Sequence, residues 1–162
     1  MAKKPSDLER TTVRSTAADL SRELRELIRE RALKRGIEDD PLGVGGEGIR
    51  THSKPLRFKG LFRRTVKEST TTALIAGDGL VVLTAIEDEP PAVLLYRLDE
   101  IDVAEFDSPL MEDSGLDLTG TPRGATERHS LFVPADHGAD GTRFREDLRA
   151  AVAAARGPRE PR

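Results

Sequence analysis

The chain has 162 residues, with 26 Lys and Arg against 29 Asp and Glu, and it contains no Cys. This length suits one domain with an appendage, and a charged fraction of 34% leaves room for only a modest core. The lack of Cys excludes disulfide bonds, Cys-ligated zinc, iron–sulfur clusters and thiol nucleophiles. No apolar run is long enough for a transmembrane helix, and no apolar segment follows the basic residues at the start. We therefore expect a cytoplasmic protein.

Residues 1–36 carry the pattern of one long amphipathic helix over 6–35. Ser6 and Glu9 have the spacing of a capping box, and Gly36 is a typical helix stop. Apolar residues recur in steps of four and three, as in a heptad seam. The steps run from Val13 through Ala17, and the seam residues predicted to contact a partner are Val13, Leu20, Leu24 and Leu27, with Ile28 widening the stripe. The seam is too short for a free coiled coil, so it packs either on the chain's own domain or on a partner helix, including that of a second copy.

Residues 37–53 are rich in glycine and acidic side chains. Gly43, Gly45 and Gly48 match the G-x-G-x-x-G spacing of dinucleotide-binding loops. Such a loop needs a buried strand before it and a helix after it, and Pro55 is incompatible with that helix. The segment is therefore predicted to be a flexible linker.

From residue 54 the apolar pattern alternates, and about seven short strands follow one another with turn signals such as Asp78-Gly79 between them. Residues 140–156 then form a helix with Phe144, Leu148 and Val152 on one face. The predicted fold is α+β: an antiparallel sheet of about seven strands, curled into a barrel and capped by a C-terminal helix, with the long N-terminal helix in front. Residues 157–162 are expected to be a disordered tail.

The order of these elements resembles that of bacterial pleckstrin-homology-like (GRAM-like) domains. The segments that carry the resemblance are Leu98-Asp99-Glu100-Ile101 leading into residues 102–106, Gly115-Leu116-Asp117-Leu118, Ser130-Leu131-Phe132-Val133 and the Phe-containing C-terminal helix. The resemblance covers about residues 54–156 and consists of element order and apolar positions, not of a diagnostic motif. That fold supports lipid binders, peptide binders and purely structural modules, so the resemblance implies a fold and does not by itself give a function.

A basic segment lies at the start of this region. Its cations alternate with Leu and Phe, and they are Lys54, Arg57, Lys59, Arg63, Arg64 and Lys67. Pleckstrin-homology domains bind phosphoinositides through basic residues of their first two strands, in a pattern that Lys54, Arg57 and Lys59 resemble. The last of these is Lys where the pattern has Arg, and Pro55 interrupts the strand. The favoured interpretation is an exposed strand whose charged residues alternate outward and whose apolar residues alternate inward. Binding to lipid head groups or nucleic acid is the alternative.

Other candidate sites lack the spacing that their chemistry needs. Asp136, His137 and Asp140 do not provide the alternating acidic ligands of a calcium loop. No pair of His residues has zinc-site spacing. Ser130 and His129 are neighbours in a predicted strand, so their side chains point to opposite faces. No metal, cofactor or nucleophile site is predicted.

An acidic cluster over residues 99–107 is expected to be a solvated sheet edge, which leaves no predicted catalytic site. The sequence therefore favours a non-enzymatic adaptor or scaffold module, whose N-terminal helix contacts a protein partner or a second copy through the seam residues. The alternative function is an anion-binding module that attaches to membrane lipid head groups or nucleic acid through the basic segment.

Overall fold

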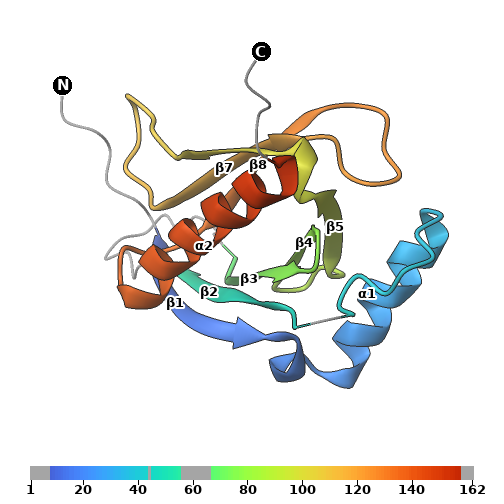
Figure 1. Ribbon diagram of the computed structural model, residues 1–162. Helices are drawn as coiled ribbons and strands as arrows, with labels where there is room; N and C mark the ends of the chain where they lie inside the picture. Colours follow the sequence, from blue (N-terminus) through green and yellow to red (C-terminus); the bar gives the residue numbers. More distant parts are fainter. Residues whose placement is uncertain (1–7, 44, 56–66, 158–162) are drawn as a thin grey trace, which may run out of the picture.

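The computed structural model describes residues 8–43, 45–55 and 67–157 of the chain (Figure 1). The first sheet has five antiparallel strands in chain order: β1 (Leu8–Thr16), β2 (Glu47–Pro55), β3 (Ser69–Ala76), β4 (Gly79–Ile86) and β5 (Ala92–Arg97). The second has three: β6 (Asp102–Glu105), β7 (Gly115–Gly120) and β8 (His129–Pro134). The α-helices are α1 (Arg22–Lys34) and α2 (Ala139–Arg156), with 3₁₀ turns η1 (Ala17–Asp19) and η2 (Leu98–Glu100). The fold is α+β, but it has eight described strands in two sheets, and over the described ranges these sheets do not close into the predicted barrel.

The long helix predicted for residues 6–35 is wrong in its first half. Residues 8–16 form β1, which pairs with β2, and α1 begins only at Arg22. The middle of β1 is rich in Thr, Val and Ser, whose side chains suit an extended backbone better than a helix. Of the predicted capping box, Glu9 lies in this strand and Ser6 lies outside the described residues.

Two local hydrogen-bond motifs mark the change from strand to helix. The backbone N–H of Thr16 donates to Asp19 Oδ2 at 2.8 Å, where β1 gives way to η1. The side chain of Ser21 then accepts from the backbone N–H of Leu24 at 3.2 Å, which satisfies an otherwise unpaired donor in the first turn of α1. The helix is therefore capped at Ser21, well after the predicted start.

The flexible linker predicted for residues 37–53 is wrong in its second half. Its last residues belong to β2, which lies between β1 and β3 and pairs with both. A Cβ atom at Gly48 would lie 1.8 Å from the carbonyl oxygen of Ala73, so glycine allows β2 and β3 to approach at this point. The N-terminal residues therefore share one sheet with β3, β4 and β5, all three of which lie in the predicted 54–156 domain.

The main core fills the space between the two sheets and α2. Tyr96 of β5, Leu116 of β7 and Leu148 of α2 are among its fully buried side chains. The helix predicted for residues 140–156 is present as α2, and its apolar face, which includes Phe144, lies in this cluster. The C-terminal helix thus holds the second sheet against the first.

A second core covers the opposite face of the five-stranded sheet. It joins Leu20, Ile28 and Ala32 of the α1 region to sheet residues such as Leu74 and Leu95. Figure 1 shows α1 and α2 on different sides of this sheet. In the described part of the chain, neither helix combines the length and hydropathy that crossing a membrane requires.

Candidate functional site

The seam residues predicted to bind a partner do not form one surface. Leu20 and Ile28 are buried in the core between α1 and the sheet, and Leu24 and Leu27 are partly buried against the same core. Val13 lies on β1, where it is 38% exposed. The helical part of the seam therefore packs on the chain's own sheet, which is one of the two arrangements that the sequence left open.

The basic segment is only partly described. Lys54, in β2, and Lys67, which precedes β3, are exposed. The other four predicted anion-binding residues, Arg57, Lys59, Arg63 and Arg64, lie outside the described residues. The described residues therefore provide no assembled anion site from this segment.

The loop before α2 and the first turn of α2 pair with the free edge of β1 at Thr12 and Arg14. Asp136 Oδ2 accepts the Thr12 N–H at 2.9 Å, and Thr12 Oγ1 accepts the Asp136 N–H at 2.8 Å. Asp140 Oδ2 accepts the Arg14 N–H at 3.1 Å. These carboxylates thus pair the donors that an edge strand leaves open. Across the described ranges, no group of three or more His, Asp or Glu side chains is placed to hold a metal ion.

The acidic cluster is more structured than the sequence predicted, because arginines from distant segments pair with it. Asp102 Oδ2 accepts from Arg128 at 2.5 Å, and its Oδ1 accepts from Arg156 at 2.8 Å. Glu105 Oε1 accepts from Arg145 at 2.7 Å. The carboxylates of β6 therefore anchor both α2 and the segment before β8.

The hydrogen bonds to Asp102 make its contribution to stability depend on pH. The hydrogen bond from Arg156, followed by that from Arg128, lowers the pKa of the Asp102 carboxyl. A carboxyl whose pKa is lower in the folded state stabilises the fold above its unfolded pKa, and this contribution is lost as pH falls through the folded pKa. We expect Asp102→Asn to be less stable than the wild type at neutral pH, with the difference shrinking below pH ~4. Urea unfolding of the wild type and the variant, at neutral pH and below pH ~4, measures this difference in stability. A difference that does not change with pH would contradict the prediction.

Arg145 is the most deeply buried charged residue of the described chain, with 5% of its surface exposed. Besides Glu105, its guanidinium donates to the backbone oxygens of Asp136 at 2.6 Å and Ala135 at 2.8 Å. This one side chain joins α2 to β6 and to the segment that follows β8. The sequence offered no signal for it, because both backbone partners depend on the tertiary fold.

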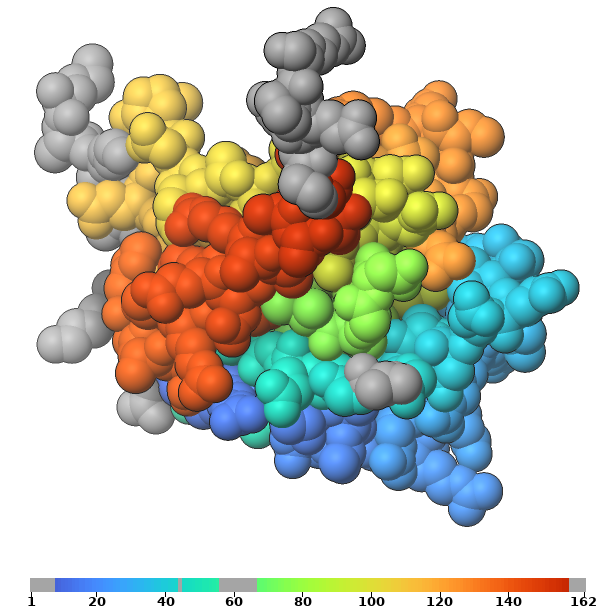
Figure 2. Space-filling model, viewed as in Figure 1, coloured from blue at the N-terminus to red at the C-terminus, as the bar shows by residue number. Residues whose placement is uncertain are grey.

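A groove runs between β6 and α2. The two elements lie side by side, since Arg156 near the end of α2 donates to the carbonyl of Ile101 at 2.5 Å and Arg145 reaches Glu105. In the space-filling view, the red C-terminal half of α2 borders the yellow residues that include β6 (Figure 2). The groove has a volume of about 520 Å³. It is lined by Ile101, Asp102, Val103, Arg149, Val152, Ala153, Arg156 and Gly157.

The β6 strand presents unpaired backbone groups at this groove. The Phe106 N–H donates to the Gly115 carbonyl, which fixes the alternation of hydrogen bonds along β6 and β7. On this alternation Ala104 bonds to β7, whereas the backbone N–H and C=O of Val103 and Glu105 point away from it. Among the described residues, no side chain or backbone group bonds to these outward-facing groups of Val103 and Glu105. An open edge therefore lies beside a partly apolar groove.

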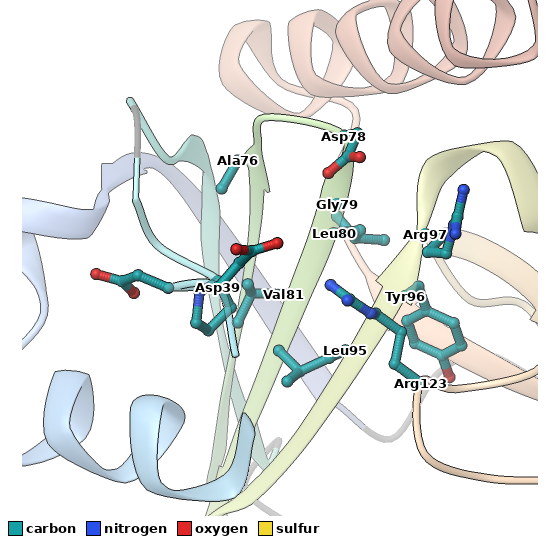
Figure 3. Close-up of a pocket in the computed structure, with 12 residues that line it drawn as sticks. Asp39, Ala76, Asp78, Gly79, Leu80, Val81, Leu95, Tyr96, Arg97 and Arg123 are labelled. Carbon is teal, nitrogen blue, oxygen red and sulfur yellow. The ribbon is translucent and has the colours of Figure 1, made fainter. Parts of the chain in front are cut away.

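A second cavity lies at the β3–β4 turn, and we call it the hairpin pocket (Figure 3). It has a volume of about 200 Å³. Its lining comes from the loop after α1, the β3–β4 turn, β5 and the loop between β7 and β8: Asp39, Asp40, Pro41, Ala76, Asp78, Gly79, Leu80, Val81, Leu95, Tyr96, Arg97 and Arg123. Figure 3 shows the guanidinium of Arg123 directed into this space. Sequence reasoning missed the pocket because its charged residues lie far apart in the chain.

Comparison of the chain with protein-family models, with curated proteins and with solved structures gives no significant match. The resemblance to pleckstrin-homology-like domains therefore stays a prediction.

Proposed function

We propose that the protein is a cytoplasmic, non-enzymatic adaptor module that binds an extended segment of a partner protein in the β6–α2 groove. The observation that carries this proposal is the open edge of β6 at Val103 and Glu105, beside the groove. An extended peptide can add to such an edge as a further strand, with backbone hydrogen bonds giving affinity and side-chain pockets giving specificity.

The side chains of the groove suggest which segment it takes. Val103, Val152 and Ala153 offer apolar surface for one side chain of the partner. Arg149 is half exposed, and its only described partner is Glu105 at 3.5 Å, so it is available to pair with a carboxylate. Residues two apart in a strand lie on the same face. We therefore propose a partner segment in which apolar and acidic residues alternate.

The open edge is short, and this sets the strength of binding. β6 has four residues, and Arg156 already occupies the Ile101 carbonyl at one end. Two residues with free backbone groups support only a small interface. Small interfaces are typical of transient signalling contacts, which suits an adaptor.

A matched pair of proline variants tests the proposal. Val103→Pro removes an outward N–H without breaking the bonds between β6 and β7, so the fold should persist. Ser130→Pro is the control, because the Ala135 N–H bond to Ser114 places the Ser130 N–H on the outer edge of β8, away from the groove. The probe is a peptide of about eight residues with alternating Val and Glu, and fluorescence anisotropy measures its binding.

We expect the peptide to bind the wild type and Ser130→Pro alike and Val103→Pro at least about tenfold more weakly. Bound peptide should also slow amide hydrogen exchange at Val103 and Glu105, the two outward groups, while Ala104 is slow throughout. Equal binding to both proline variants, or protection that spares Val103 and Glu105, would contradict strand addition at β6.

A further inference from the structure

The charged groups of the hairpin pocket fall into two sets, and the first set is already paired. Asp40 accepts from Arg29 at 3.2 Å and from the Leu42 N–H at 3.0 Å. Arg97 binds Asp99 through two nitrogens, at 3.1 and 3.0 Å. These residues shape the wall of the pocket, and their charges are neutralised within the chain.

The second set has looser contacts, and Asp78 lies near enough to Arg97 for the two charges to attract each other. The carboxylates of Asp39 and Asp78 and the guanidinium of Arg123 make no hydrogen bond and no ion pair with any described residue, including one another. Arg123 is half-buried, and its backbone is fixed because its N–H donates to the Leu95 carbonyl at 2.7 Å. The Arg123 guanidinium is not among the buried polar groups that lack a partner, so water reaches it, and a ligand carboxylate that replaces this water gains a charge-assisted hydrogen bond. Both signs of charge thus line one cavity, and the side chains of Asp39 and Arg123 have no hydrogen-bond or ion-pair partner among the described residues.

The volume of the cavity limits the ligand that can satisfy these groups. About 200 Å³ corresponds to roughly six or seven water molecules at ~30 Å³ each. Pockets for drug-sized ligands are larger, at about 300–1,000 Å³. The hairpin pocket therefore suits a small polar molecule with fewer than about ten heavy atoms.

We infer that the hairpin pocket binds a small zwitterion with the chemistry of a free α-amino acid. Its carboxylate pairs with Arg123, and its ammonium group lies between Asp39 and Asp78. A simple anion would meet two carboxylates, and a simple cation would meet the guanidinium, so each would gain one contact and suffer repulsion from the other. A zwitterion complements both. The inference is independent of the peptide groove, which lies between β6 and α2 and is lined by different residues.

Isothermal titration calorimetry with glycine and alanine tests the inference, with acetate and methylamine as probes that each keep only one of the two charges. We expect both amino acids to bind and both single-charge probes to bind at least about tenfold more weakly. Asp78→Asn and Arg123→Gln should each weaken amino-acid binding by a similar factor. Asp147→Asn, on the exposed face of α2, is the matched control and should leave it unchanged.

Three results would overturn the inference. Acetate that binds as tightly as glycine would indicate a plain anion site, and methylamine that does so would indicate a plain cation site. Glycine and alanine that give no heat of binding at ~10 mM would exclude the site, because this concentration is well above a Kd of ~1 mM, which is typical of a weak ligand. Circular dichroism of each variant separates lost binding from lost folding, and Asp78→Asn, an exposed isosteric change, keeps the test valid if Arg123→Gln unfolds.

Discussion

Replacing Arg145 with Met should lower the free energy of unfolding by about 3 kcal/mol, because the guanidinium satisfies three acceptors from a buried position. Met keeps the length of the apolar stem but donates no hydrogen bond. The backbone oxygen of Asp136 would lose its only described donor, whereas that of Ala135 would keep the Ser114 hydroxyl. Glu105 would lose its closest cation. Arg145→Met would therefore leave buried acceptors without a donor. This costs more free energy of unfolding than the net contribution of the lost hydrogen bonds.

Arg149→Met provides the matched control for Arg145→Met. Both arginines belong to α2 and contact Glu105, but Arg149 is half exposed and its contact is 3.5 Å long. Exposed pairs of this kind contribute at most about 1 kcal/mol, so this variant should be close to the wild type in urea unfolding. Equal losses in the two variants would mean that the charge on Glu105, and not the buried carbonyl bonds of Arg145, determines the effect.

The sequence predicted the helices better than it predicted the strands that pair over long distances. The spacing of Leu27 and Ile28, three and four residues after Leu24, correctly placed one apolar face on α1. The same spacing extended to Val13 by coincidence. That residue is in a strand because β1 pairs with β2, more than thirty residues later. Periodicity records local preference, whereas this pairing is a tertiary interaction that overrides it.

The glycine-rich stretch shows the same limit of sequence reasoning. Its composition is typical of a linker, yet Ile37 and Leu42 in its first half are buried in the core beneath α1. Gly48 is there because β3 approaches too closely for a side chain. Only the position of Ala73 on the neighbouring strand reveals this, and sequence reasoning from one segment contains no information on such a contact.

The candidate sites depend even more on distant contacts. The acidic residues of β6 were recognised as a cluster, but their partners Arg128, Arg145 and Arg156 come from the segment before β8 and from α2. The residues themselves are common charged types without a motif. The groove and the hairpin pocket form where segments that are distant in the sequence lie side by side in the fold, and the sequence alone does not predict these contacts.

Ile28→Asp should destabilise the protein by at least about 4 kcal/mol, since it removes a fully buried side chain and places a carboxylate in the core beneath α1. Ile28 has 0% of its surface exposed and packs in the cluster that joins α1 to the five-stranded sheet. Chemical denaturation followed by circular dichroism measures the loss. Because α1 covers one whole core, we expect the fluorescence of a hydrophobic dye to rise as that sheet face is uncovered.

Leu33→Asp is the matched control, because it makes a comparable change on the same helix at a side chain that is 67% exposed. It should cost less than about 1 kcal/mol, mainly through an unfavourable charge near the C-terminal end of the helix dipole.

The two variants also distinguish the two arrangements that the heptad seam allowed. If α1 docks on its own sheet, Ile28→Asp destabilises the protein, and the molecules that remain folded keep the oligomeric state of the wild type. A variant that instead stays folded and changes only from dimer to monomer in analytical ultracentrifugation would place Ile28 at an interface between two copies, contrary to its burial against Leu74 and Leu95 within one chain.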